Sequence, residues 1–238
     1  MTTPVTRIAN TTLLLSLLLL AAGFADAQVR PSIAGLQAQI ATLQAQVDSG
    51  TIPGVSGYAT LDTSVPSRPT LRIAGANLQV VNGLGGTATA NGVGNVIVGY
   101  DETSSSSNLT CSLGEHWNSQ PACLSAGGTW AISHKTGSHN VVVGALNSYS
   151  RYGGVVAGLN NRATGGYSSA IGGFTNLAAG FESTVTGGSV NVASGSASSV
   201  TGGSSNTATG TSSAVSGGAS RSATGGNDWR AGSLLEDN

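Results

Sequence analysis

Few side chains of this chain could do chemistry, and the ones that could lie near the middle of the sequence. The only cysteines, Cys111 and Cys123, are twelve residues apart, and three histidines, His116, His134 and His139, lie close by. Two cysteines can form a disulfide in an oxidising compartment or supply thiolates to a metal. His116 falls between the cysteines, which fits no common zinc pattern. We therefore predict a disulfide and no metal site, with a zinc site as the alternative.

Catalysis finds little support in the sequence. A nucleophile needs a base that a third group holds in place. Ser133 and Ser138 adjoin His134 and His139, but nearly all other serines lie in repeats without a histidine nearby. The phosphate-binding glycine loop is absent, and Glu182 is the only carboxylate between residues 168 and 226. The sequence therefore predicts no enzyme, no catalytic residue and no cofactor.

The composition limits both the core and the surface. Of 238 residues 36 are Gly, while 8% are charged and 5% aromatic, and the net charge is -1. Nucleic-acid binding needs clustered basic residues, so that partner is excluded as a main function. A large core needs aromatic and branched apolar side chains, which are scarce. The many Gly and Ser residues would indicate disorder if they had no period, but they have one.

The first residues have the pattern of an export signal. Arg7 precedes an apolar run from Leu13 to Ala22, and Ala25-Asp26-Ala27 offers the small residues that signal peptidase reads. The run is shorter than the roughly 20 apolar residues of a membrane-spanning helix. We predict a signal peptide over residues 1–27, an extracellular or bacterial cell-surface location, and no transmembrane segment in the mature chain. An uncleaved anchor is the alternative.

Residues 28–50 are predicted to form a short coiled-coil helix. Apolar residues recur at alternating spacings of three and four, which places them along one side of a helix. They are Ile33, Leu36, Ile40, Leu43 and Val47. Two heptads are marginal alone, so this seam either registers chains held together elsewhere or packs on the chain's own domain. Isoleucine alternating with leucine would by itself favour a dimer.

The second half of the chain repeats every 14 or 15 residues, in units that we call rungs. Glycine pairs recur at 172–173, 187–188, 202–203 and 217–218. An asparagine recurs in step at Asn147, Asn161, Asn176, Asn191 and Asn206. A small apolar residue recurs at Val142, Val156, Ala170, Val185, Val200 and Val215.

These periods have a physical meaning. A rung of this length holds two strands of about five residues and two turns, and glycine suits the turns. Stacked strands place equivalent side chains about 4.8 Å apart, so the asparagines can form a hydrogen-bonded ladder and the apolar residues a core. The sequence therefore predicts an all-β parallel solenoid over residues 138–226. Because its rungs are thin, we expect its flat face to pack on other chains; a capped monomeric roll is the alternative.

The repeat also resembles a known family. Residues Ser198 to Gly210 read Ser-Ser-Val-Thr-Gly-Gly-Ser-Ser-Asn-Thr-Ala-Thr-Gly, which is similar to the head repeats of YadA-like trimeric autotransporter adhesins. The likeness covers residues 138–226 and extends weakly to residues 95–99. It implies a left-handed parallel β-roll, a homotrimer, and a host, matrix or cell-surface ligand. The family's neck, stalk and barrel anchor have no counterpart in residues 227–238, so we expect release, retention by a partner, or the product of a truncated gene.

Residues 51–137 are predicted to form an N-terminal β region that carries an insertion closed by the disulfide. Strands are expected over residues 71–81 and 95–99. Long loops on a rigid scaffold often carry binding sites, so His116, Trp117 and Trp130 are candidates for a contact surface. Alternatively, the two tryptophans plug the open N-terminal end of the roll. Trp229 and its neighbours in residues 227–238 are expected to cap the other end.

Together these features predict an exported, adhesin-like structural or binding protein. The alternative is an ice- or crystal-surface binder, because outward Thr and Ser at regular spacing could match a lattice. Against it, Ile171 and Ser216 interrupt the threonine file.

Overall fold

The computed structural model describes residues 32–48, 55, 57–103 and 109–231. The chain divides into two compact units, Met1–Leu78 and Gln79–Asn238. The predicted signal peptide and the last seven residues lie outside the described residues. Within the described part, no helix is both long enough and apolar enough to cross a membrane.

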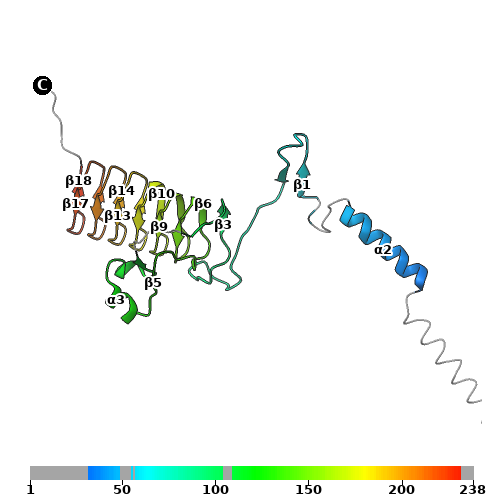
Figure 1. The fold of residues 1–238 in the computed structure, drawn as a ribbon, viewed down its shortest axis with the longest axis horizontal. Coiled ribbons are helices and arrows are strands. Elements are labelled where there is room, and N and C mark those ends of the chain that lie inside the picture. Colours follow the sequence, from blue (N-terminus) through cyan, green and yellow to red (C-terminus); the bar gives the residue numbers. More distant parts are fainter. Residues whose placement is uncertain (1–31, 49–54, 56, 104–108, 232–238) are drawn as a thin grey trace, which may run out of the picture. The chain divides into compact units, whose positions relative to one another are not determined.

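The first unit contains a helix and a hairpin (Figure 1). Helix α2 spans Ile33–Asp48, and the hydroxyl of Ser32 accepts a hydrogen bond from the nitrogen of Gly35 at 3.0 Å, as an N-cap does. Strands β1 (Ala59–Asp62) and β2 (Thr70–Ile73) pair antiparallel, so the expected strand over residues 71–81 ends at Ile73. The described residues of the heptad seam are exposed: Ile33 76%, Leu36 43%, Ile40 64% and Leu43 60%.

The second unit is a parallel β-solenoid of about 15 residues per rung, which confirms the predicted fold class (Figure 1). One sheet holds, in spatial order, β3 (Val96–Val98), β6 (Val141–Ala145), β8 (Val155–Leu159), β10 (Ser169–Phe174), β12 (Thr184–Val185), β14 (Ser199–Val200), β16 (Ala214–Val215) and β18 (Trp229–Arg230). The other holds β7 (Ser148–Tyr149), β9 (Arg162–Ala163), β11 (Leu177–Ala178), β13 (Val192–Ala193), β15 (Thr207–Ala208) and β17 (Ser222–Ala223). All neighbouring strands in these two sheets run parallel.

The core is a narrow strip of small side chains. The first sheet contributes Val142, Val156, Ala170, Val185, Val200 and Val215, each at most 1% exposed. The second sheet contributes Tyr149 and then Ala163, Ala178, Ala193, Ala208 and Ala223, each at most 3% exposed. Residues of this size bury little apolar area per rung, so main-chain and side-chain hydrogen bonds between rungs must supply much of the cohesion.

A ladder of buried asparagines supplies part of those bonds. Asn147, Asn161, Asn176, Asn191 and Asn206 are at most 1% exposed. The side-chain oxygen of Asn176 accepts from the main-chain nitrogen of Asn191 at 3.0 Å. Its side-chain nitrogen donates to the carbonyls of Gly172 in the same rung and Gly188 in the next, both at 3.1 Å. The ladder therefore links side chain to backbone across rungs, and not amide to amide.

The corners of the rungs use glycine in two ways. As expected, glycines of the recurring pairs hold left-handed angles, for example Gly188 (φ 81°). A Cβ on Gly195 would lie 2.0 Å from the carbonyl oxygen of Gly210, so this glycine allows close stacking of rungs at an ordinary φ. Other left-handed corner positions are held by residues with side chains, for example Val190 (φ 58°) and Ser205 (φ 56°). Such angles are uncommon for non-glycine residues and unusual for a β-branched one.

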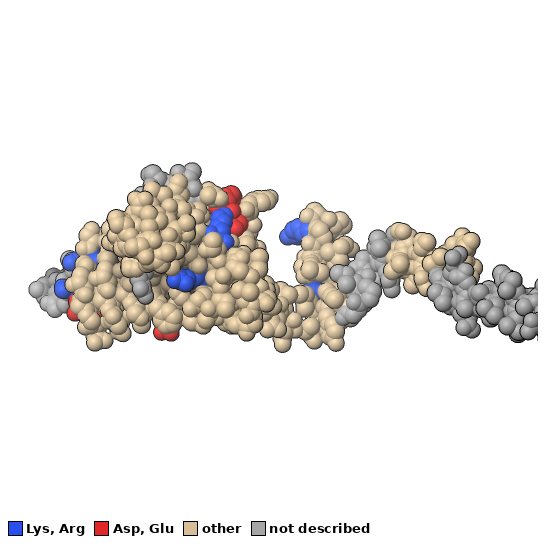
Figure 2. Space-filling view, turned by 90° about the horizontal axis from the view of Figure 1, so that it is seen from below, with Lys and Arg blue, Asp and Glu red and all other residues tan. Residues whose placement is uncertain are grey.

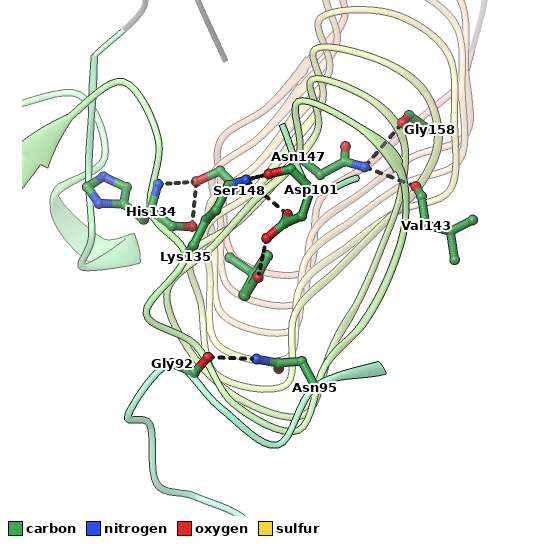
Figure 3. Close-up of polar contacts among 10 residues, drawn as sticks. Gly92, Asn95, Asp101, His134, Lys135, Val143, Asn147, Ser148 and Gly158 are labelled. Atoms are coloured by element: carbon green, nitrogen blue, oxygen red, sulfur yellow. Dashed lines mark hydrogen bonds and ion pairs between the residues drawn. The ribbon is translucent and has the colours of Figure 1, made fainter. Parts of the chain in front are cut away.

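The N-terminal end of the core is closed by Tyr149. It is 2% exposed, and its hydroxyl donates to a carboxylate oxygen of Asp101 at 3.0 Å. The other carboxylate oxygen lies 3.0 Å from Nζ of Lys135, which also donates to the Asp101 carbonyl (Figure 3). Burial, and then the bond and charge of Asp101, raise the pKa of Tyr149. In the segment that precedes this end of the roll, the main-chain nitrogen of Asn82 donates a hydrogen bond to Nε2 of His139.

At the other end, the last described rung exposes its tryptophan. Trp229 is 67% exposed, and its indole N–H donates to the hydroxyl of Ser216 at 2.8 Å. Arg230 pairs in register with Val215, so it occupies the position in the last described rung that the core residues occupy in the earlier rungs. The predicted cap by Trp229 is therefore not formed by a buried indole.

Candidate functional site

The insertion in the first rung forms a small disulfide-closed hairpin. Strands β4 (Thr110–Cys111) and β5 (Trp130–Ala131) pair antiparallel, and between them lie the 3-10 helix η1 (Gly114–His116) and helix α3 (Gln120–Ser125). Cys111 and Cys123 form the disulfide, with their Cα atoms 5.6 Å apart. Both cysteines are thereby consumed, so neither supplies a thiolate to zinc. Among the described residues, no group of three His, Cys, Asp or Glu could hold a metal ion.

This hairpin lies against the side of the solenoid (Figure 1). Its first strand crosses successive rungs. Nε2 of His134 donates to the carbonyl of Thr110 at 2.9 Å, and the hydroxyl of Ser150 donates to the carbonyl of Ser112 at 2.7 Å. Further along, a Cβ on Gly114 would lie 1.7 Å from the carbonyl oxygen of Ala179, so only glycine allows this approach.

Outward side chains of the second sheet are buried in the rungs that the hairpin covers. The outward residues Arg162 and Leu177 are each 5% exposed, and Ala179 is 1% exposed. The residues equivalent to Ala179 in the next two rungs are Ser194, which is half-buried, and Thr209, which is exposed. The hairpin therefore covers the early rungs and leaves the later ones open.

A pocket of about 350 Å³ separates the hairpin from the roll. The hairpin lines it with Leu113, Gly114, His116 and Ala126, and the roll with Arg151, Tyr152, Thr164, Gly165, Gly166, Ala179 and Phe181. Neither Asp nor Glu is among the lining residues whose side chains the structure describes. In the part of the chain that the structure describes, no carboxylate pairs with Arg151.

Aromatic side chains gather at the corner of the roll beside this pocket. The Tyr167 ring makes edge-to-face contacts with Tyr152 at 5.1 Å and with Phe181 at 5.7 Å between centroids. Main-chain bonds show that Tyr152, Gly166, Phe181, Ser196 and Thr211 occupy equivalent corner positions. Phe181 therefore stands where the next two rungs carry Ser and Thr. It is 46% exposed, and Tyr167 is 40% exposed.

Of the site residues predicted from sequence, His116 lines the pocket, while Trp117 and Trp130 are half-buried in the same hairpin. The hairpin lies along the flank and Tyr149 closes the end of the core, so the two tryptophans do not match the interpretation as an end plug. Sequence reasoning missed Arg151, Tyr152 and Phe181. A signal existed, since aromatic residues stand at a corner position that carries Gly, Ser or Thr in the other rungs.

Two basic groups where the hairpin meets the roll have shifted pKa values. Burial lowers the pKa of His134, a shift that its bond to Thr110 opposes and the charge of Arg162 adds to. Burial also lowers the pKa of Arg162. Elsewhere charge is sparse: Figure 2 shows a face on which most residues are neither acidic nor basic. A basic pocket stands out on such a surface.

Comparisons of the chain with models of protein families, with curated proteins and with solved structures give no match.

Proposed function

We propose that this chain is an exported, adhesin-like binding protein without catalytic activity, whose solenoid presents the disulfide-closed hairpin to another surface. The observation that carries the proposal is the pocket between hairpin and roll, with exposed aromatic rings at its edge. A rigid repeat scaffold that holds one irregular loop cluster is a common arrangement for binding. The disulfide supports export, because disulfides persist in oxidising compartments.

Binding without catalysis is supported by the state of His134, one of the two histidines that adjoin a candidate serine nucleophile in the sequence. Nε2 of His134 faces a carbonyl oxygen, which only accepts hydrogen bonds, so this nitrogen carries the proton. It therefore cannot accept a proton from Ser133 through that atom.

Adhesion is tested with microspheres that carry the exported chain. They are applied to intact cells, matrix proteins and polysaccharides, each immobilised separately. The comparison variant replaces residues 113–128, which include Cys123, by a short Gly/Ser linker and replaces Cys111 by serine. We expect adhesion to at least one surface and its loss in the variant, while circular dichroism shows the roll intact. Equal adhesion by both proteins, or none by the full chain, contradicts the proposal.

We further propose that three chains assemble through the face formed by β6, β8 and β10. Apolar side chains on or beside these strands are exposed, including Val141 (40%), Leu159 (44%), Ile171 (40%) and Phe174 (49%). Contiguous exposed apolar residues mark interaction surfaces, and the exposed seam of α2 offers a second contact. Light scattering on a sizing column should give three times the mass of one chain. A single-chain mass contradicts the trimer.

The ice- or crystal-surface alternative receives less support. The hydroxyl of Thr186 donates to the carbonyl of Thr201 at 2.6 Å. This hydroxyl of the threonine file therefore donates its hydrogen within the molecule and not to a crystal surface. Thermal hysteresis in solution would revive this alternative.

A further inference from the structure

We propose that the pocket between hairpin and roll binds a sugar acid, meaning a pyranose ring that carries a carboxylate, as in a uronic-acid unit of a polysaccharide. The inference deepens the proposed adhesin function and rests on it. Three observations carry it: the charge of the pocket, the aromatic corner at its edge, and a hydroxyl in its wall that lacks a partner.

The charge favours an anionic ligand. Arg151 and the imidazole of His116 line the pocket, and the lining residues whose side chains the structure describes include no acid. The guanidinium of Arg151 makes no ion pair among the described residues. A planar guanidinium offers two parallel donors that match the two oxygens of a carboxylate. Among the described residues that line the pocket, none carries a negative charge that would compensate this one.

The aromatic corner favours a ring-shaped ligand. Tyr152 and Phe181 both line the pocket, and Gly166 lies between them. A Cβ on Gly166 would lie 3.3 Å from each of the two rings, so glycine keeps the space between them narrow but open. Aromatic faces carry partial negative charge and therefore attract the C–H bonds on the apolar face of a sugar. The same corner position carries Ser196 and Thr211 where no hairpin lies opposite.

The third observation is a polar group in the pocket wall without a partner. Thr164 is fully buried, and its hydroxyl oxygen makes no hydrogen bond in the structure. Buried hydroxyls are normally paired. Thr164 lines the pocket, and a Cβ on Gly114 of the hairpin would lie 3.1 Å from the Thr164 carbonyl oxygen. A hydroxyl-rich ligand in the pocket supplies the partner after a small displacement of the hairpin.

The test measures binding of short oligogalacturonates to the full exported chain by isothermal titration calorimetry. The matched probe is the same oligomer with its carboxylates methyl-esterified, which keeps the ring and removes the charge. We expect binding of the acid form, weakening with salt, and at least about 10-fold weaker binding of the ester, given the strength of charged hydrogen bonds.

Two variants address the two features of the site. Arg151→Gln should weaken binding of the acid form by about 10-fold or more and leave binding of the ester unchanged. Phe181→Ser, which installs the residue found at the same corner of the next rung, should weaken both forms about 5-fold. Arg230→Gln, on the last described rung, is the charge-matched control and should bind as the unmodified chain does.

The inference is overturned if neither oligomer binds, if acid and ester bind equally, or if Arg151→Gln binds as tightly as Arg230→Gln. These failures differ from failure of the proposed function. If microspheres of the Arg151→Gln variant still adhere as the unmodified chain does, adhesion stands and the sugar-acid site falls. If oligogalacturonate binds but no surface is bound, the site stands and the adhesin function falls.

Discussion

The side-chain oxygen of Asn191 accepts a hydrogen bond from the main-chain nitrogen of Asn206 at 2.9 Å, one rung further along the solenoid. Asn191 also donates to the carbonyls of Gly187 and Gly203. One side chain thus satisfies three main-chain groups in a region where it is itself fully buried. An asparagine at this corner acts as a fastener between rungs.

Replacing Asn191 by alanine should destabilise the roll by about 3 kcal/mol or more, because it leaves buried main-chain groups unpaired. The measurement is the free energy of unfolding from denaturant titration. Asn118→Ala, at an exposed position, is the control and should change stability by less than about 0.5 kcal/mol. Equal effects of the two substitutions would show that the ladder contributes nothing.

The two glycines of one pair should respond oppositely to alanine. A Cβ on Gly203, which has φ +79°, would lie 2.0 Å from the Gly218 oxygen, whereas a Cβ on Gly202 meets no heavy atom within 4 Å. Gly203→Ala should cost about 3 kcal/mol or more through strain and overpacking. Gly202→Ala should be neutral or stabilise by up to about 1 kcal/mol. Thermal unfolding of both variants tests the contrast, and a reversed order would contradict it.

Val190→Asn should raise stability. Val190 holds a left-handed φ of 58°, and Asn160 holds the equivalent corner at 56°. Asparagine tolerates this region better than a β-branched residue, so relief of strain should contribute about 1 kcal/mol. Val192→Asn, on the strand that follows, is the matched control and should bring no gain. A lower melting temperature for Val190→Asn than for the unmodified chain would refute the strain argument.

Acidification should destabilise the seam between hairpin and roll. The pKa of His134 is lowered from its ordinary value of 6.5, chiefly by burial. The unfolded chain therefore binds the proton more readily than the folded one. Stability from this group is complete above the unfolded value and falls as the pH drops below it. Melting temperatures at about pH 7 and about pH 5 should differ more for the unmodified chain than for His134→Gln. Parallel pH dependences would contradict this assignment.

Reduction of the disulfide should loosen the hairpin without unfolding the roll. Closing a loop of this size contributes about 3 kcal/mol in the loop-entropy description. The two clusters of buried apolar residues in the roll include neither cysteine. Limited proteolysis under reducing conditions should cut first within residues 109–131, with the circular dichroism of the roll retained. Simultaneous loss of both would show that the hairpin holds the roll together.

The repeating part of this molecule was readable from the sequence because each of its periods has one physical cause. Val185, Val200 and Val215 recur since a strand must turn the same side chain inward in every rung. The left-handed corners could not be read in this way, because Leu146, Asn160 and Val190 share a backbone angle and no side-chain chemistry.

The candidate site was only partly readable. His116 lies where a long insertion suggested, but its pocket partners Arg151 and Phe181 come from the roll. Their proximity depends on how the hairpin folds back, and that is set by contacts such as Ser112 with Ser150 and Gly114 with Ala179. A non-repeating segment offers no second copy from which to infer such contacts. The same reason explains why Tyr149, and not a tryptophan, was found at the end of the core.

The asparagine ladder links each rung only to its neighbours, so among the described rungs beyond the hairpin this ladder does not fix how many rungs there must be. A duplicated stretch from Asn191 to Ser205 would meet the same partners on both sides that the original meets. Gene-level gain or loss of single rungs can therefore change the distance between the hairpin and the far end without redesign of either. The length of the solenoid beyond the hairpin can therefore change while the hairpin and the rungs it contacts stay the same.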